Sequence, residues 1–479
     1  MNLILEIKFV LKITALHKFS ALALILLVLL VPASLAQAQE DQADYPVYVV
    51  QAGDNISAIA SRFGVSVTDL AQVNGILNVN IVNAGDELRI PGLTGIQGRL
   101  VTEVIEYGET LRSLSRLYQV PVEVISYLNH ITSPIELYAG SNLIILEKDE
   151  AGLSGERASL KPGQSLLEMA VLQGTDVWTL ANMNYLQGTW EALPGDVLRL
   201  PNQGADGPGS LPGAITRIEV GPLPFVQGKT SVIQLQAEQP LTISGQWMDG
   251  PLNFFRHQDG SYVAIQGVHA MLEPGVYPLT LSGKLEDGTP FGFSQLVQVN
   301  AGGYVYEEIP GVDPITLDPS VSRPEDEQWI ALVEPVTVER LWDGVFEFPS
   351  PPHFYGCWPS MFGSRRSYNQ SGYFYFHTGL DVCGQVGDDV FAPARGQVVF
   401  TGEMTVRGSA IMINHGWGIY TGYMHLSDIL VNIGDWVEPG QLIGKVGATG
   451  RVTGPHLHWE IWAGGVQVDP LDWLAQEYP

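Results

Sequence analysis

Two short motifs near the end of the sequence carry side chains that could bind one metal ion. His377 and Asp381 lie four residues apart in the first motif, and His456 and His458 lie two residues apart in the second. Because side chains alternate faces along a strand, the two imidazoles of the second motif point to the same side. Two nitrogens and one oxygen suit zinc and leave a fourth position for water, which is typical of a catalytic site. The pattern therefore predicts a metal-dependent hydrolase.

The elements that must position these residues are short strands. The stretch after residue 350 is rich in glycine and in β patterns such as 396–400 and 440–444. We therefore expect an antiparallel sheet with a groove. This stretch also holds six of the ten histidines, namely His353, His377, His415, His425, His456 and His458.

An ordered series of motifs covers residues 355 to 474. It consists of Phe362–Arg366, His377–Asp381, Val390–Ala394, Ile413–Gly416, Tyr423–Leu426, Val446–Gly450, Gly454–Glu460 and Asp469–Pro470. Over this length the sequence resembles the lysostaphin-type (LytM-like) zinc metallopeptidases, which cut peptide cross-links of bacterial cell walls. The resemblance implies one zinc ion per chain.

The resemblance also implies a role for each histidine of the motifs. Residues His377, Asp381 and His458 match the zinc ligands, and His425 and His456 match two further active-site histidines. One imidazole would take a proton from zinc-bound water and another would donate to the oxyanion or the leaving amine. The sequence does not divide these roles between His425 and His456. A tyrosine near the oxyanion is implied in some members, and the candidates are Tyr368, Tyr373 and Tyr375.

The remaining histidines are interpreted as structural. His415 stands in an Asn-His-Gly turn, His353 has no motif around it, and His257 and His269 stand alone in the middle of the chain. An isolated histidine is most often a satisfied core or surface residue.

A repeat with a period of 55 residues runs from residue 45 to 202. Turn glycines recur at Gly53, Gly108 and Gly163, and a second set recurs at Gly85, Gly140 and Gly195. Between the two turns, apolar residues at spacings of three and four predict two short helices. Each unit is therefore expected to be strand–helix–helix–strand.

This unit resembles the LysM (lysin motif) module, which binds glycan containing N-acetylglucosamine. The first copy matches along its length, from Tyr48 to Pro91, and the second keeps Gly108, Leu128-Asn129 and Gly140. The third copy keeps Gly163, Asn182 and Pro194–Pro201. The second and third copies are degenerate, and two interpretations stay open for them: glycan binding, or a spacer that kept only the fold.

Between the repeats and the motifs lie two regions without evident chemistry. Six alternating runs between residues 218 and 299 predict an immunoglobulin-like sandwich of strands. Residues 301–350 are rich in proline and acidic residues, and a capping box at Ser322–Glu325 predicts one helix over 323–333.

The N-terminus is typical of a secretory signal. Lys8, Lys12 and Lys18 precede an apolar run over 21–31, and Ala36-Gln37-Ala38 fits a cleavage site. An uncleaved anchor is the alternative, and it is the only membrane attachment we expect. A net charge of −27 disfavours nucleic acid as a partner. The only cysteines, Cys357 and Cys383, are expected to form a disulfide in an oxidising compartment.

The sequence as a whole predicts a multidomain, mainly β protein. The expected parts are a signal peptide (1–38), a LysM repeat (45–92), two degenerate LysM-like repeats (101–147 and 156–201), a linker (202–213), an immunoglobulin-like sandwich (214–300), a connector (301–350) and a zinc metallopeptidase domain (351–479). The combination implies a secreted or envelope-associated bacterial endopeptidase acting on peptidoglycan. A non-catalytic activator or scaffold of another wall hydrolase is the alternative, and the intact ligand set disfavours it.

Overall fold

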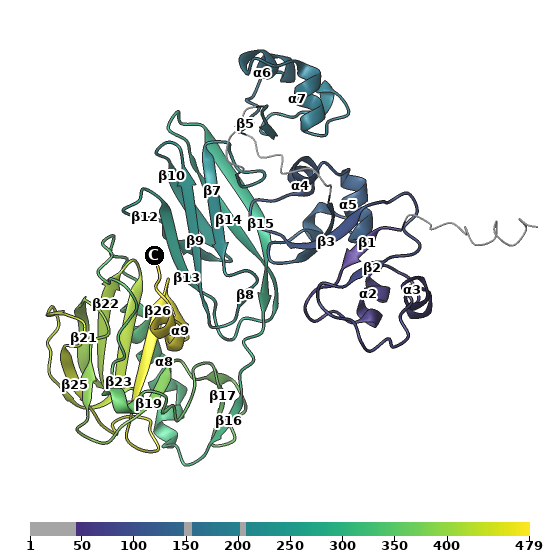
Figure 1. Cartoon of the computed structure of the whole chain (residues 1–479). Helices are drawn as coiled ribbons and strands as arrows, with labels where there is room; N and C mark the ends of the chain where they lie inside the picture. The colour runs from purple at the N-terminus through teal and green to yellow at the C-terminus, as the bar shows by residue number, and fades with distance from the viewer. Residues whose placement is uncertain (1–44, 148–155, 202–206) are drawn as a thin grey trace, which may run out of the picture. The chain divides into compact units, whose positions relative to one another are not determined.

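The computed structural model describes residues 45–147, 156–201 and 207–479 (Figure 1). The predicted signal peptide and the first part of the predicted linker lie outside the described residues. Within those residues, no helix combines the length and the apolar character needed to cross a bilayer. The chain divides into two compact units. The described part of the first unit covers residues 45–101 and 146–147, and the second unit contains the other described residues.

All three repeats have the order strand–helix–helix–strand. Repeat 1 contains β1 (Val47–Val49), α2 (Ile56–Arg62), α3 (Val67–Val73) and β2 (Glu87–Arg89). Repeat 2 contains β3 (Arg99–Val104), α4 (Leu111–Tyr118), α5 (Val122–Leu128), η1 (Pro134–Glu136) and β4 (Asn142–Glu147). Repeat 3 contains β5 (Arg157–Ser159), α6 (Leu166–Leu172), α7 (Val177–Met183), η2 (Thr189–Glu191) and β6 (Val197–Arg199).

One asparagine holds each repeat together in the same way. Asn74 donates its side-chain amide to the carbonyls of Leu70 and Arg89, both at 2.8 Å, and accepts from the Arg89 amide at 2.7 Å. Asn129 and Asn184 make the equivalent three bonds in repeats 2 and 3. The second helix is thereby tied to the closing strand. In repeat 3 the matching residue is Asn184, and the sequence interpretation of Asn182 was wrong.

Two antiparallel sheets form a sandwich in the middle of the chain. One has the order β11-β10-β14-β15-β8 and the other β12-β13-β9-β7. The strands are β7 (Ile215–Gly221), β8 (Phe225–Val226), β9 (Thr230–Ala237), β10 (Thr242–Trp247), β11 (Gly250–Leu252), β12 (Phe255–Arg256), β13 (Tyr262–Gly267), β14 (Gly275–Lys284) and β15 (Pro290–Asn300). Only the short contact of β8 with β15 is parallel. The immunoglobulin-like topology stays a prediction.

The connector is more ordered than its composition suggests. It contains β16 (Tyr306–Ile309), η3 (Pro314–Leu317) and α8 (Pro319–Ala331). The helix begins four residues before the predicted start, because Asp318 caps it by accepting from the Ser320 amide at 2.8 Å. Pro319 occupies the first helical position, where its missing N–H costs nothing. Pro324 lies inside the helix and does not end it.

The C-terminal region is built on one large antiparallel sheet of order β19-β26-β23-β22-β21-β24, to which β20, β25 and β27 are added. A small sheet joins β16 to β17 and β18. The elements are η4 (Pro352–Phe354), β17 (Arg365–Tyr368), β18 (Tyr375–Phe376), β19 (Leu380–Cys383), β20 (Asp389–Phe391), β21 (Gly396–Met404), β22 (Gly408–Gly416), β23 (Ile419–Ile429), β24 (Trp436–Val437), β25 (Leu442–Val446), β26 (His456–Ala463), β27 (Val466–Val468) and α9 (Pro470–Ala475). The mainly β fold class is confirmed.

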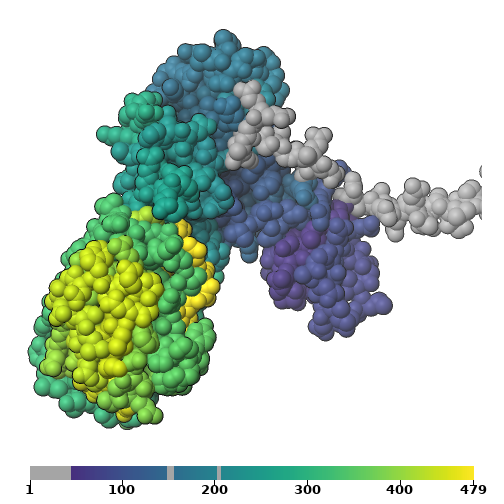
Figure 2. Space-filling model, turned by 60° about the vertical axis from the view of Figure 1, so that its left-hand side comes forward, coloured from purple at the N-terminus to yellow at the C-terminus, as the bar shows by residue number. Residues whose placement is uncertain are grey.

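The sandwich and the C-terminal sheet share a hydrophobic core. Phe255 of β12 stacks on Trp417 with ring centroids 5.1 Å apart, and Val263 and Ile265 belong to the same buried cluster. Lys229 pairs with Asp469 at 2.9 Å across this interface. In the space-filling view the green atoms that follow the sandwich and the yellow atoms of the last strands form a continuous surface (Figure 2).

A disulfide braces the start of the C-terminal region. Cys357 and Cys383 are bonded, with Cα atoms 5.5 Å apart. Cys383 is the last residue of β19, two residues after Asp381, so the bridge ties the entrance segment to the strand that carries this predicted ligand.

Candidate metal centre

Three of the predicted site residues converge on one point. Asp381 in β19 and His458 in β26 are direct partners across antiparallel strands, and His377 stands just before β19. Their closest atoms are His377 Nε2, Asp381 Oδ1 and His458 Nδ1, which lie 2.8 to 2.9 Å from one another. All three residues are buried, and together they form a group that could hold a metal ion.

The outer hydrogen bonds of the two imidazoles fix which nitrogens face inward. His377 Nδ1 lies 2.9 Å from the Met361 carbonyl, and His458 Nε2 lies 3.4 Å from Glu460 Oε1. Each of these nitrogens must carry the proton, because its partner can only accept. Two nitrogen lone pairs and a carboxylate oxygen then face one another without a hydrogen between them. Such a donor set fits a cation such as zinc.

The pKa shifts of His377 and Asp381 support this state. Burial lowers the pKa of His377 to about 4, so its imidazole is neutral at pH 7. Burial would lower the pKa of His458 as well, but its hydrogen bonds with Asp381 and Glu460 raise it. Burial alone would raise the pKa of Asp381, but its electrostatic contacts with His377, followed by those with His456 and His458, hold it well below its usual value. A neutral imidazole and an ionised carboxylate are the forms that bind metal.

A buried carboxylate supports His458 from behind. Glu460 Oε2 accepts hydrogen bonds from the indole nitrogens of Trp462 at 2.8 Å and Trp329 at 3.0 Å. Burial would raise the pKa of Glu460, but the hydrogen bond and electrostatic contact with His458, followed by the Arg407 charge, lower it to about 2. Trp329 belongs to α8, so the connector helix is linked to the candidate metal centre through Glu460.

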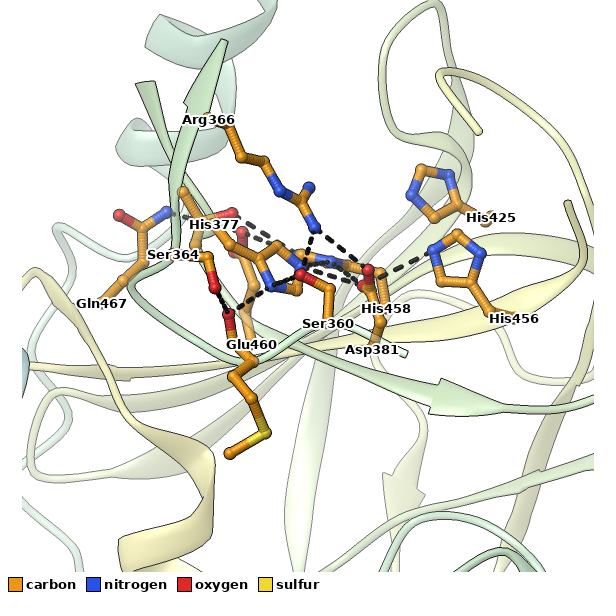
Figure 3. Close-up of polar contacts among 12 residues, drawn as sticks. Ser360, Ser364, Arg366, His377, Asp381, His425, His456, His458, Glu460 and Gln467 are labelled. Carbon is orange, nitrogen blue, oxygen red and sulfur yellow. Dashed lines mark hydrogen bonds and ion pairs between the residues drawn. The ribbon is translucent and has the colours of Figure 1, made fainter. Parts of the chain in front are cut away.

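The second oxygen of Asp381 is held by an arginine. Arg366 Nη2 donates to Asp381 Oδ2 at 3.2 Å and to Ser360 Oγ at 2.8 Å (Figure 3). Its Nε lies 3.4 Å from Glu307 Oε2. This contact leaves Asp381 Oδ1 directed toward the two imidazoles. Because Glu307 lies in β16, the connector supports the group on this side as well.

His425 and His456 lie side by side next to the group, as Figure 3 shows, with ring centroids 5.1 Å apart. His425 Nδ1 donates to the Thr449 carbonyl and His456 Nδ1 to the Gly454 carbonyl, both at 2.8 Å. In both rings Nε2 is therefore the nitrogen that points away from these carbonyls, and Nε2 of His456 lies 3.4 Å from Asp381 Oδ1. The His425 backbone has φ 67°, a conformation that costs energy and is found at functional sites.

A cavity of about 850 Å³ opens beside these residues, and its lining includes all five. The far walls come from outside the C-terminal region. The connector contributes Glu307, Glu308, Ile309, Val312, Asp326 and Ile330, and the sandwich contributes His269 and Met271. Sequence reasoning treated His269 as an isolated residue, yet it lies in the wall, where it packs edge-on against Phe376 with centroids 5.3 Å apart.

The structure separates the three candidate tyrosines. The Tyr368 hydroxyl lies 3.4 Å from Arg366 Nη1 and its side chain is buried. Tyr375 lines the cavity and is partly exposed, whereas Tyr373 packs against Tyr306 and is not in the lining. Tyr368 also lines the cavity, so the structure sets aside Tyr373 and leaves Tyr368 and Tyr375 as candidates. His415 is buried between the Arg395 carbonyl and Thr421 Oγ1, which agrees with a structural role.

Sequence reasoning missed Glu460 and Arg366 as parts of the site, although both stand inside the motifs. The signal for Glu460 was its spacing, because a residue two positions after His458 on a strand lies on the same face. Arg366 offered no comparable signal, since its contact with Asp381 depends on how β17 and β19 pack.

Comparisons with known proteins agree with this geometry. The model of peptidase family M23 matches residues 375–470, and the LysM domain model matches residues 48–91 and 104–146. The chain is 38% identical over 111 residues to the peptidoglycan DD-endopeptidase ShyC of Vibrio cholerae, an alignment that covers 23% of this chain and 26% of the relative. It is 44% identical over 95 residues to the DD-carboxypeptidase/endopeptidase Mpg of Neisseria meningitidis, covering 20% of this chain and 22% of the relative.

Among solved structures, the antimicrobial peptidase lysostaphin from Staphylococcus simulans is 34% identical, with a TM-score of 0.20, over 21% of this chain and 44% of that chain. The chain spans about a quarter of the length of the curated relatives it matches. In this chain, therefore, LysM domains precede a domain of peptidase family M23.

Proposed function

We propose that the protein is a zinc-dependent endopeptidase that cleaves peptide cross-links of peptidoglycan. The observation that carries this proposal is the convergence of His377, Asp381 and His458 beside two further histidines in one cavity. The M23 match and the similarity to peptidoglycan endopeptidases over the same residues support it. When bound, zinc would polarise the scissile carbonyl and lower the pKa of its water.

His425 and His456 are proposed to move protons. Both present Nε2, because their Nδ1 protons are held by backbone carbonyls. One of them takes the proton of the attacking water, and the other donates to the oxyanion or to the leaving amine. With ring centroids 5.1 Å apart, both histidines could act on one scissile bond.

The surroundings of the domain suggest where this reaction takes place. LysM repeats ahead of the peptidase would hold the enzyme on wall glycan and raise the local concentration of cross-links. We propose a secreted or envelope-associated location in a bacterium, with peptidoglycan as the partner. A non-catalytic activator of another wall hydrolase is disfavoured, because the full ligand set and both additional histidines are present.

The test is hydrolysis of purified peptidoglycan by the full-length protein. We expect clearing of the suspension, loss of clearing with a chelator and recovery with Zn²⁺. The His458→Ala variant should lose at least about 1,000-fold in rate, because a metal ligand is removed. Clearing by this variant at the wild-type rate would contradict the proposal.

The bond that is cut is identified with defined muropeptides. Fragment masses after digestion distinguish cleavage of glycine bridges from cleavage between D-alanine and a diamino acid. The His425→Ala and His456→Ala variants should retain zinc, measured by metal analysis, and lose about 100- to 10,000-fold in rate. Loss of zinc from either variant would make that histidine a ligand and contradict the assignment.

A further inference from the structure

One arginine in the wall of the cavity has no carboxylate partner among the described residues. Arg451 lies over the ring of Tyr368, with its guanidinium carbon 4.4 Å from the ring centroid, and its Nη1 is 3.4 Å from the Thr316 carbonyl. The other arginines of the lining are paired. Arg366 contacts Asp381 and Glu307, and Arg407 contacts Glu325 and Asp326.

Among the described residues Arg451 has no carboxylate partner, although the protein is rich in acidic residues. The chain has 51 acidic and 24 basic residues, so carboxylates are abundant. Arg451 has five N–H donors, and the Thr316 carbonyl takes one of them at a long distance. Its position in the lining of the cavity leaves the remaining donors available to a bound molecule.

The guanidinium is held in place from two sides. The Arg451 amide donates to the Val406 carbonyl at 2.8 Å, which fixes the loop that carries it. The preceding Gly450 has φ +75°, and a Cβ there would lie 2.5 Å from the same carbonyl, so the loop approaches that backbone closely. The Tyr368 ring supports the guanidinium plane from below. A pre-oriented fork of donors loses little entropy on binding.

A short series of contacts connects Arg451 to the metal group. The Tyr368 hydroxyl lies 3.4 Å from Arg366 Nη1, and Arg366 Nη2 donates to Asp381 Oδ2 at 3.2 Å. Arg451, Tyr368, Arg366 and Asp381 therefore follow one wall of the cavity. A molecule bound at the metal group can reach Arg451 along that wall.

We propose that Arg451 forms a subsite for a free carboxylate of the peptide substrate, close to the scissile bond. The planar guanidinium would bind both carboxylate oxygens, a geometry in which arginine is stronger and more selective than lysine. This inference rests on the proposed endopeptidase function and narrows its substrates to peptides that keep a free carboxylate beside the cleaved bond.

The experiment compares two cross-linked peptides that differ only in this group, one with the carboxylate and one with the carboxamide. Wild-type protein should cleave the carboxylate peptide with a kcat/KM about 10- to 100-fold higher, as expected for a hydrogen bond between charged groups. In Arg451→Met this ratio should fall close to one, and Arg451→Lys should be intermediate. Metal content and thermal unfolding are measured for every variant.

Arg395→Met is the matched control. Arg395 also lies over an aromatic ring, with its guanidinium carbon 5.0 Å from the Trp436 ring centroid, but it is not in the lining of the cavity. Its loss should leave the ratio unchanged. The proposal is overturned if Arg451→Met lowers the cleavage of both peptides equally, or if the ratio of the wild-type protein is already one.

The two proposals fail in different ways. If the wild-type protein cleaved neither peptide, the proposed endopeptidase function would be contradicted. Binding of the same two peptides to the His458→Ala variant then tests the subsite alone, with calorimetry as the readout. A preference for the carboxylate that disappears in the His458→Ala, Arg451→Met double variant supports the subsite, and equal binding of both peptides overturns it.

Discussion

Repeats 1 and 2 have the same fold but opposite surroundings at their turns. The pair of turn glycines is Gly53 and Gly85 in repeat 1, and a Cβ added to either would meet no atom within 4 Å. The equivalent pair in repeat 2 is Gly108 and Gly140, and both are buried. A Cβ on Gly140 would lie 2.9 Å from the backbone of Pro224.

The residues that precede these glycines are likewise buried in repeat 2 and exposed in repeat 1. Tyr107 of repeat 2 is 2% exposed, and its hydroxyl donates to the sandwich carbonyl of Leu279 at 2.9 Å. Ala139 joins the same core and bridges to Val297 of β15. The corresponding residues of repeat 1, Ala52 and Ala84, are exposed.

Repeat 3 resembles repeat 1 in this respect. Gly163 and Gly195 are exposed, and a Cβ on either would meet nothing within 4 Å. Yet the LysM model matches repeat 2 and its matched ranges end at residue 146. Similarity to the LysM model thus indicates the fold of a repeat. It does not indicate whether the turns of that repeat are exposed to solvent or buried against another part of the chain. We propose that repeat 2 is a joint to the sandwich, while repeats 1 and 3 offer open turns to glycan.

The largest effect is expected on glycan binding. The Ala52→Glu, Ala84→Glu double variant of repeat 1 is made in the full-length His458→Ala protein. Its binding to insoluble peptidoglycan, measured by sedimentation, should fall by about 10- to 100-fold, because one of two linked binding modules is blocked. Glutamate at Pro162 and Pro194 in repeat 3 should have a similar effect. Unchanged sedimentation of both variants would contradict the proposed role of the open turns.

A smaller effect is expected on stability at the joint. The Gly85→Ala and Gly140→Ala variants both force an alanine into a positive φ, 91° and 87° respectively. This backbone strain should lower the free energy of unfolding by about 1–3 kcal/mol in each variant. Gly140→Ala should lose about 1–3 kcal/mol more, because its methyl group overlaps Pro224. Denaturant unfolding of the two variants measures the difference. Equal losses would show that the sandwich does not restrain repeat 2.

The smallest effect concerns one hydroxyl. Tyr107→Phe should destabilise the protein by about 1–2 kcal/mol, because the Leu279 carbonyl loses a buried donor. Tyr127→Phe in the same repeat is the control, since Tyr127 is 57% exposed and its hydroxyl removal should change stability by less than about 0.5 kcal/mol. Sedimentation with peptidoglycan should be unchanged in Tyr107→Phe, and a loss would place repeat 2 among the glycan-binding modules.

Features that repeat or alternate along the chain could be predicted from sequence. The period of 55 residues led to the turns, and the alternating runs led to the strands of the sandwich. The five histidine and aspartate positions came from short motifs on β19, β23 and β26 and in the segment just before β19. Each of these signals is local, so the fold could be read before the parts were brought together.

Contacts between distant segments could not be predicted in this way. Trp329 and Glu460 are 131 positions apart, and nothing in either segment indicates that one donates to the other. His269 reaches the cavity only because the sandwich packs against β18 and β27. Gly108 is buried in the same way, because a Cβ there would lie close to Pro208 and Leu211, and Gln295 of the sandwich accepts from its amide at 2.9 Å.

The shared core of the sandwich and the C-terminal sheet limits how this protein can be divided. A gene fragment that begins at residue 351 would leave Trp417 without Phe255, and Asp469 and Asp472 without Lys229. A fragment that keeps this shared core therefore starts ahead of β7, and transferring the proposed activity to another carrier requires moving the sandwich with it. For protein engineers the exchangeable module is this fused pair.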